Sequence, residues 1–114
     1  MAKNRKYDKF RNIKIKGEKL MNQNDILMHN EDFISRIIDD EAVLMSPIGD
    51  GLHVFNEIGT RIWELMDGKN SIGDIVEQIC QEYEVEKSTA YDDVVMFLEE
   101  LLNINAIIYG SNKG

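Results

Sequence analysis

The sequence predicts an α+β domain in which a three-stranded antiparallel sheet is followed by three helices. Residues 33–56 contain short apolar runs with the alternation and the turn residues that are typical of strands. From residue 56 onward the apolar residues recur with helical spacing, and capping residues divide them into three segments. A chain of 114 residues has the size of one ordinary domain with a modest core.

Turn residues divide the strand region into three strands. Asp39 and Asp40 separate the first two, whereas Gly49 and Gly51 supply the positive φ angles that a second tight turn requires. Pro47 lies where a strand should end. A sheet this small has two edges with unpaired backbone groups, unless another segment covers them. The predicted strands are FISRII at 33–38, AVLMSP at 42–47 and LHVFN at 52–56.

The first predicted helix covers NEIGTRIWELMDG at 56–68. Asn56 is a good N-cap, because its side chain can accept from free backbone N–H groups of the first turn, and Gly68 is a good stop signal. Gly59 is unusual inside a helix, where glycine costs roughly 1 kcal/mol relative to alanine. We therefore expect a backbone or a large side chain to approach Gly59 closely, with Trp63 as the candidate or its neighbour.

Two further helices are predicted after this one. Ser71 and Asp74 form the Ser-x-x-Asp pattern of a capping box, which predicts a helix from 71 to about 84. Ser88 is the predicted N-cap of a third helix that ends near residue 102. The segment AIIYG at 106–110 either forms a short terminal strand or closes the helix bundle.

The third helix carries a wide apolar sector. Its eight apolar residues cover about 160° at 100° per residue, whereas about 100° suffices for a surface helix. One margin of the sector is therefore available for a contact outside the core. The eight residues are Ala90, Tyr91, Val94, Val95, Phe97, Leu98, Leu101 and Leu102.

The charges divide the chain into two regions. Residues 1–20 contain 8 basic and 2 acidic side chains, and residues 21–114 contain 5 basic and 19 acidic ones. We interpret residues 1–28 as a basic, flexible extension and residues 29–114 as the folded domain. The alternative for NIKIKG at 12–17 is a strand that pairs with a sheet edge. Because the basic start is not followed by a secretory or membrane-spanning apolar run, the sequence predicts a cytoplasmic protein.

The sequence has no pattern of a known catalytic, metal or cofactor site. It lacks a phosphate-binding Gly-rich loop, a Cys/His metal spacing and a nucleophile motif such as Gly-x-Ser-x-Gly. His29 and His53 have no evident partner. Cys80 falls in the apolar stripe of the second helix, which predicts a buried small hydrophobe. We therefore expect neither enzymatic activity nor a bound metal or cofactor.

Strands followed by a helix pair that resembles a helix-turn-helix describe a winged-helix-like fold, for which DNA binding is the usual inference. The third helix opposes this inference, because residues 88–102 contain four carboxylates and no Lys or Arg, and would repel phosphates. The alternative function is therefore a DNA-binding regulator that uses the basic N-terminal arm. The basic residues of that arm are Lys3, Arg5, Lys6, Lys9, Arg11, Lys14, Lys16 and Lys19.

Three segments resemble the PqqD-like family, whose small domains are also called RiPP recognition elements, after the ribosomally made peptides that they bind. The resemblance covers residues 33 to about 109 and leaves the basic extension unexplained. That extension would dock a modifying enzyme, occupy an open strand edge or have no role. The matching segments are NEIGTRIWELMDG at 56–68, SIGDIVEQICQEYEV at 71–85 and DDVVMFLEELLNINAII at 92–108.

The resemblance implies an adaptor that binds the leader of a precursor peptide and presents it to a maturation enzyme, such as a radical-SAM protein or a protease. The leader would add as an antiparallel strand to the third strand, beside the third helix. Strand alternation directs either Leu52 and Val54 or His53 and Phe55 toward that helix. Open strand edges also allow a paired homodimer. The implied peptide-binding residues are Leu52, His53, Val54 and Phe55 on the strand, and Val94, Phe97, Leu98 and Leu101 on the helix.

Two carboxylates flank the apolar sector of the third helix. Asp92 and Asp93 are adjacent in sequence, so they point about 100° apart and do not form a paired acid–base or metal site. Either one can accept a Lys or Arg side chain of a bound peptide. We include both among the candidate peptide-binding residues.

Overall fold

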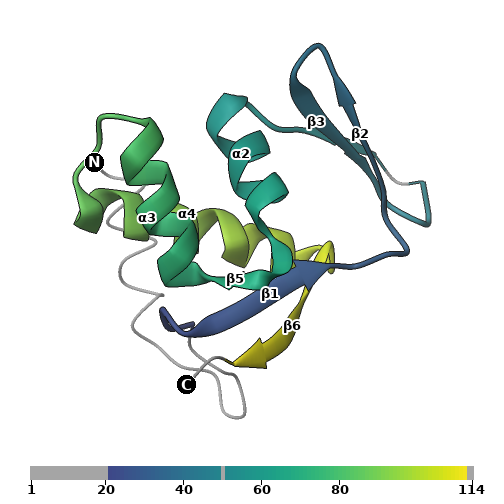
Figure 1. Cartoon of the computed structure of the whole chain (residues 1–114). Helices are drawn as coiled ribbons and strands as arrows, with labels where there is room; N and C mark the ends of the chain where they lie inside the picture. The colour runs from purple at the N-terminus through teal and green to yellow at the C-terminus, as the bar shows by residue number, and fades with distance from the viewer. Residues whose placement is uncertain (1–20, 50, 113–114) are drawn as a thin grey trace, which may run out of the picture.

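The computed structural model describes residues 21–49 and 51–112, which form two three-stranded antiparallel sheets and three helices (Figure 1). One sheet has the strand order β5-β1-β6 and the other has the order β2-β3-β4. In chain order the elements are β1 (Asp25–His29), β2 (Ile34–Ile38), β3 (Glu41–Met45), β4 (Leu52–Val54), α2 (Glu57–Leu65), β5 (Asp67–Ser71), α3 (Ile72–Glu82), α4 (Lys87–Asn103) and β6 (Ile107–Asn112).

The predicted sheet of three strands followed by three helices is confirmed. β2 pairs with β3 from Ile34 opposite Met45 to Ile38 opposite Glu41, and β3 pairs with β4. Asp39 and Asp40 have φ angles of 52° and 67°, the left-handed conformation that a two-residue hairpin turn requires and that aspartate tolerates.

The second sheet was not predicted. β1 lies partly within residues 1–28, which the sequence assigned to the flexible extension, so residues 25–28 belong to the folded part. Ile26 and Leu27 are consecutive and both buried, and the register of β1 shifts against β5 between Ile26 and Met28 and against β6 between Asp25 and Leu27. A strand with such an irregularity lacks the strict alternation by which a strand is recognised in a sequence. Residues 1–20, including NIKIKG at 12–17, lie outside the described residues.

β5 was also missed, and it changes where α2 ends. The predicted stop at Gly68 is wrong, because α2 ends at Leu65 and residues 67–71 pair with β1. The sequence DGKNS has little strand propensity. Its backbone pairing with β1, and not its side chains, therefore holds it in the extended conformation. Gly68 has a φ of 83°, which suits glycine.

The predicted helix starts are confirmed for α2 and α3 and wrong for α4. Asn56 Oδ1 accepts from Gly59 N–H at 2.8 Å, and Ser71 and Asp74 form a complete capping box. Glu86 is the N-cap of α4, so Ser88 already lies in the first turn and caps nothing. The segment at 106–110 forms most of the strand β6. Within residues 21–49 and 51–112, no helix is long and apolar enough to cross a membrane.

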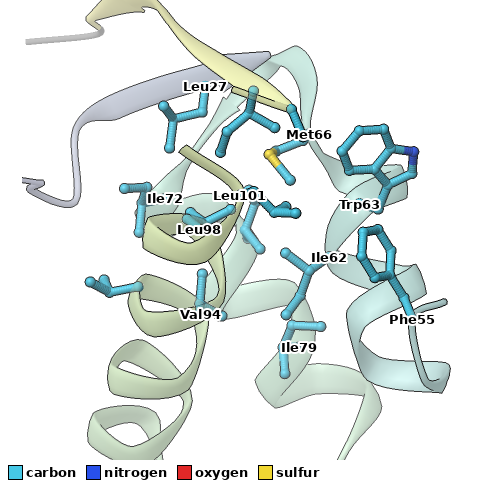
Figure 2. Packing of buried hydrophobic residues seen from close by; sticks show 14 of the residues in the cluster. Leu27, Phe55, Ile62, Trp63, Met66, Ile72, Ile79, Val94, Leu98 and Leu101 are labelled. Carbon is cyan, nitrogen blue, oxygen red and sulfur yellow. The ribbon is translucent and has the colours of Figure 1, made fainter. Parts of the chain in front are cut away.

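α3 and α4 cover one face of the sheet β5-β1-β6, and α2 lies between these helices and the sheet β2-β3-β4 (Figure 1). The apolar residues of all three helices meet in one core (Figure 2). Trp63 is 4% exposed and packs against His29 of β1 and against Phe55, the residue that follows β4. Cys80 packs against the core but is only partly buried, so it is less enclosed than the sequence predicted.

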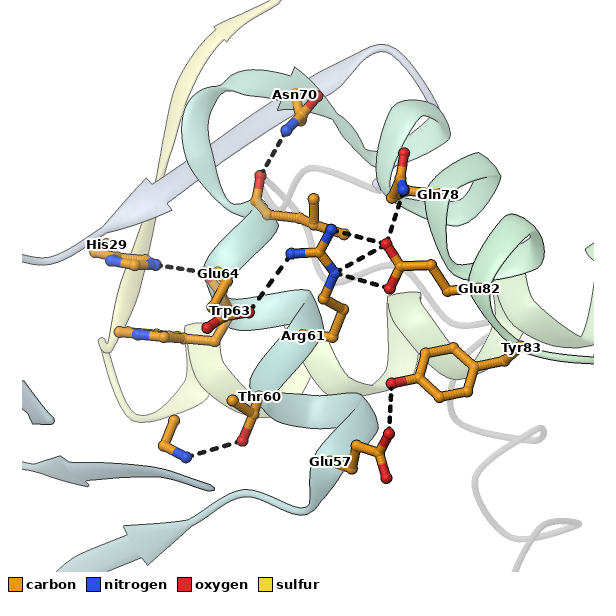
Figure 3. Close-up of polar contacts among 12 residues, drawn as sticks. His29, Glu57, Thr60, Arg61, Trp63, Glu64, Asn70, Gln78, Glu82 and Tyr83 are labelled. Atoms are coloured by element: carbon orange, nitrogen blue, oxygen red, sulfur yellow. Dashed lines mark hydrogen bonds and ion pairs between the residues drawn. The ribbon is translucent and has the colours of Figure 1, made fainter. Parts of the chain in front are cut away.

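A bidentate ion pair fixes α2 against α3. Arg61 Nε donates to Glu82 Oε1 at 2.8 Å and its terminal nitrogen donates to Oε2 at 2.7 Å (Figure 3). The hydrogen bonds from Arg61 lower the pKa of the Glu82 carboxyl and raise that of the guanidinium. Since both side chains are about one third exposed, at 33% and 30%, water screens the pair, and its main effect is to orient the helices.

A threonine hydroxyl joins α2 to the end of the β3–β4 ladder (Figure 3). Phe55 N–H donates directly to Ala42 C=O at 2.9 Å. The second bond of this pair would run from Ala42 N–H to Phe55 C=O, and the Thr60 hydroxyl takes its place. Ala42 N–H donates to Thr60 Oγ1 at 2.8 Å, and that hydroxyl donates to Phe55 C=O at 3.4 Å. Thr60 is 5% exposed, so these groups have no access to bulk water. The first turn of α2 is thereby bonded to both strands.

We expect Thr60→Val to lower the free energy of unfolding by about 1–3 kcal/mol, because it leaves the buried Ala42 N–H without an acceptor. Thr60→Ser keeps the hydroxyl and should cost less. Urea unfolding followed by circular dichroism measures both variants. Equal stability of Thr60→Val and the wild type would show that the hydroxyl does not replace the ladder bond.

Candidate functional site

A groove of about 690 Å³ runs between β4 and α4. Residues 52–56 form its strand side, and Phe97, Glu100, Leu101 and Ile104 form its helix side. Phe55 lies 5.1 Å from Phe97, measured between the ring centroids, in an edge-to-face contact. Apart from Glu100, the helix side is apolar. The groove therefore suits apolar side chains of a ligand, and Glu100 is the charged group at its rim.

The structure determines which face of β4 is directed toward the helices. His53 lies opposite Leu44, which is fully buried at 0% exposure, and Phe55 is 7% exposed. Leu52 and Val54 are each 60% exposed on the other face. His53 and Phe55 therefore form the floor of the groove, whereas Leu52 and Val54 point to the outer side of the sheet.

Within the described part of the chain, no strand pairs with the outer edge of β4, so its backbone presents hydrogen-bonding groups there. β4 is the last strand in the order β2-β3-β4, and Val54 lies opposite Val43. Because Phe55 N–H donates to β3, alternation in an antiparallel ladder directs the N–H and C=O groups of Val54 and Leu52 away from β3. These groups lie along the groove, where an extended segment can pair with them.

Only some of the residues that the sequence predicted for the site lie in the groove. Leu52, His53, Val54, Phe55, Phe97 and Leu101 are brought together there. Val94 and Leu98 are 1% and 0% exposed, so they are core residues that support α4 from within. Asp92 is exposed beside Tyr91 and Lys87 at a different hollow. Asp93 is exposed one turn before Phe97, and so shares its face of α4.

Three lining residues were not predicted from the sequence: Asn56, Glu100 and Ile104. Glu100 and Ile104 follow Phe97 by three and seven residues, so they share its side of the helix. Extending the helical spacing from Phe97 would have found them. The sequence indicated Asn56 only as the N-cap of the first helix. The structure confirms this role, and Asn56 lines the groove as well.

Aromatic rings support the groove floor from behind. The ring centroids of Phe55 and Trp63 lie 5.7 Å apart. His29 stacks on the other side of the indole, with ring centroids 3.7 Å apart and an interplanar angle of 7°. His29 Nε2 donates to the backbone C=O of Trp63 at 2.8 Å, which places a proton on Nε2 (Figure 3). His29 therefore has a partner, contrary to the expectation from the sequence.

Gly59 is required by the same aromatic cluster. A Cβ atom at this position would lie 3.2 Å from Phe55 Cβ and 3.3 Å from Phe97 Cζ. It would also lie 3.2 Å from Asn56 Oδ1, which caps α2. The predicted close approach is present, but Phe55 and Phe97 make it, and not Trp63.

The charges on α4 do not favour nucleic acid. Asp92, Asp93 and Glu100 are exposed. Lys87, the one basic residue of α4, pairs with Glu77 at 2.6 Å, and the hydrogen bond to that carboxylate raises its pKa. The DNA-binding alternative gains no support from this surface. Among the residues that the structure describes, no group of three His, Cys, Asp or Glu side chains is placed to hold a metal ion.

A comparison with protein families identifies the group to which the sequence belongs. The family model described as coenzyme PQQ synthesis protein D (PqqD) matches residues 41–107, which include β3, β4 and all three helices. The chain belongs to the PqqD family. The whole groove lies within the matched region of this PqqD-family chain, whereas β1 and β2 precede it. Among curated proteins, none matches the chain.

Two solved structures share the fold. TbiB1 in complex with the TbiA(β) leader peptide is 31% identical, with a TM-score of 0.65 over 70% of this chain and 93% of that chain. A lasso peptide synthetase B1, complexed with its leader peptide, is 18% identical, with a TM-score of 0.66 over 72% of this chain and 96% of that chain. The second likeness shows the fold alone.

We expect Gly59→Ala to destabilise the protein, although alanine in a helix interior is normally favoured by about 1 kcal/mol. The new methyl group meets Phe55 Cβ, which is fixed to the backbone, and displaces the Phe97 ring. Urea unfolding gives the sign of the change, and aromatic NMR shifts of Phe97 report the displacement. A gain in stability of about 1 kcal/mol, with unchanged Phe97 shifts, would contradict the close packing described here.

Proposed function

We propose that this PqqD-family protein is an adaptor that binds the leader segment of a ribosomally made precursor peptide. The leader adds to β4 as an antiparallel strand and places alternate side chains in the groove beside α4. The observation that carries this proposal is the free edge of β4, with Leu52 and Val54 backbone groups pointing along an apolar groove. Backbone pairing supplies affinity and the groove supplies selectivity, as in other cases of β-augmentation.

The edge at β4 is better suited to this role than the opposite edge of the same sheet. All five residues of β2 are exposed, whereas β4 has α4 beside it. A strand added at β4 buries one row of its side chains against Phe97, Leu101 and Ile104. A strand added at β2 would make similar backbone hydrogen bonds but would have no groove beside it in which to bury a row of side chains.

The groove also indicates the chemistry of the peptide. Phe97, Leu101 and Ile104 favour apolar side chains at alternate positions of the leader. Glu100 at the rim, and Asp93 one turn before Phe97, favour a Lys or Arg near that apolar row. The relative TbiB1, at 31% identity, was solved with a leader peptide, which supports a ligand of this class.

We further propose that the adaptor presents the captured precursor to a separate maturation enzyme, such as a radical-SAM protein or a protease. Holding a disordered substrate beside the enzyme raises its local concentration to about the millimolar range for a short linker. The outer face of the sheet β2-β3-β4 is the candidate docking surface, because it adjoins the β4 edge. Ile34, Met45 and Leu52 form one row of this face and are 54%, 40% and 60% exposed.

We expect Val54→Pro to weaken binding of a candidate leader peptide by about tenfold or more, because it removes one edge donor and leaves a peptide carbonyl unpaired. The fold should persist, since the Val54 N–H does not bond to β3. Val54→Thr is the matched control, because it keeps the donor. Fluorescence anisotropy measures affinity and thermal unfolding checks the fold. Equal affinities of Val54→Pro and Val54→Thr would contradict strand addition at β4.

We expect Ile34→Glu to leave leader affinity unchanged and to slow the maturation of the precursor by its partner enzyme, because it places a charge on the proposed docking face. Ile108→Glu is the matched control, since Ile108 is also an exposed apolar residue, at 48%, but belongs to the other sheet. Product formation over time is followed by mass spectrometry. Equal rates for both variants would remove the outer face from the proposal.

A further inference from the structure

A second hollow, of about 500 Å³, adjoins one end of the groove. It lies between the β3–β4 loop, the segment that precedes β2, and the C-terminal end of α4. His53 and Ile104 line both spaces, so they form the boundary between them. We call this second space the loop pocket; its other lining residues include Asn30, Phe33, Ile48 and Asn105.

The direction of the chain determines which part of a bound peptide reaches the loop pocket. β4 and α4 run in opposite directions, because Phe55 meets Phe97 at one end of the groove while His53 and Ile104 meet at the other. A strand antiparallel to β4 therefore enters at the Phe55 end and leaves at the Leu52 end. The residues that follow the paired segment, toward the C-terminus of the peptide, arrive at the loop pocket.

The lining of the loop pocket suits a large uncharged side chain. None of its lining residues carries a carboxylate, an ammonium or a guanidinium group. Uncharged polar residues and apolar residues both line it: Asn30, Ser46, His53, Asn103 and Asn105 are polar, and Phe33, Pro47, Ile48 and Ile104 are apolar. Phe33 is partly buried and packs against the core. Ile48 is 80% exposed, the most exposed of the large apolar side chains in the described part of the chain. An isoleucine held this far out of the core gains from an apolar contact brought by another molecule.

One wall of the loop pocket is built in place. Asn30 Nδ2 donates to the C=O of Asn105 at 2.8 Å, and Asn30 Oδ1 accepts from Asp32 N–H at 3.0 Å. Asn30 N–H also donates to the C=O of Ala106 at 2.9 Å. These bonds join the segment before β2 to the end of α4. The pocket therefore does not depend on peptide binding for its shape on this side.

We propose that the loop pocket is a second specificity subsite, which takes a large apolar or aromatic side chain from the residues immediately C-terminal to the segment paired with β4. This inference rests on the proposed function, since it requires a peptide strand at β4. One end of the groove opens into this second, uncharged space, so recognition has two parts. The groove takes alternate side chains of the segment paired with β4, whereas the loop pocket selects the side chain that follows.

The test is a double-mutant cycle between the protein and a synthetic leader peptide that binds to it, chosen from candidate precursors encoded near this gene. The protein variant is Ile48→Asp, which changes an exposed loop residue and not the core. On the peptide side, each apolar residue is replaced by alanine in turn. We expect Ile48→Asp to weaken binding of the unaltered leader about tenfold. One alanine-substituted leader, with the substitution downstream of the paired segment, should bind to Ile48→Asp and to the wild type with equal affinity. Ile38→Asp, 52% exposed on β2, is the matched control and should bind normally.

The outcomes separate the two proposals. The subsite is overturned, while the adaptor function stands, if the leader binds to Ile48→Asp with unchanged affinity. The same holds if the alanine substitution that removes the effect of Ile48→Asp lies within or upstream of the paired segment. Amide shifts of labelled protein locate the paired segment on β4. If no leader binds to the wild-type protein, the adaptor function and the subsite fall together. Thermal unfolding of both aspartate variants confirms that the fold is retained.

Discussion

The hydrogen bonds and packing at Phe55 hold the two sides of the groove in place. Its N–H bonds to Ala42 in β3 and its C=O accepts from Thr60 in α2, so the residue joins the sheet to the first helix. Its ring packs against Trp63 (Figure 2) and makes an edge-to-face contact with Phe97 of α4. The edge strand, the helix behind it and the helix across the groove are therefore fixed by one side chain and its backbone.

Since Phe55 is held on every side, the groove is a property of the fold and does not require a bound peptide. Gly59 permits the close approach of Phe55 and Phe97, and Trp63 fills the space behind them. His29 covers the far face of Trp63 and bonds to its carbonyl, which also ties β1 to α2. The sheet β5-β1-β6 thereby supports the site from a distance without lining it. A binding edge that is held in place in advance loses less entropy when it binds a disordered peptide.

Local signals were sufficient to predict much of this fold. Asn56 and the Ser71–Asp74 pair are recognised within four residues of sequence, and both caps are formed. β1 and β5 were missed because their pairing joins segments some forty residues apart, and neither has the alternation of a half-buried strand. The wide apolar sector of α4 was correctly expected to exceed the needs of the core. Its centre, at Val94 and Leu98, is buried, and its margin at Phe97 lines the groove.

The site itself was harder to predict, because strand alternation leaves two equal choices for β4. Only the packing of Leu44 and Phe55 directs His53 inward and Leu52 and Val54 outward. The same packing assigns Asp92 to another hollow, although its neighbour Asp93 shares the side of Phe97. These assignments depend on how a helix is rotated against a strand, which no local pattern records.

Amide hydrogen exchange of β4, with and without a bound candidate leader peptide, tests strand addition most directly. The N–H groups of Leu52 and Val54 face the open edge, whereas Phe55 N–H is already bonded to Ala42. We expect the peptide to slow exchange at Val54 and Leu52 and to change exchange at Phe55 little. Protection that appears along β2 or β6 instead, with Val54 and Leu52 unchanged, would contradict it.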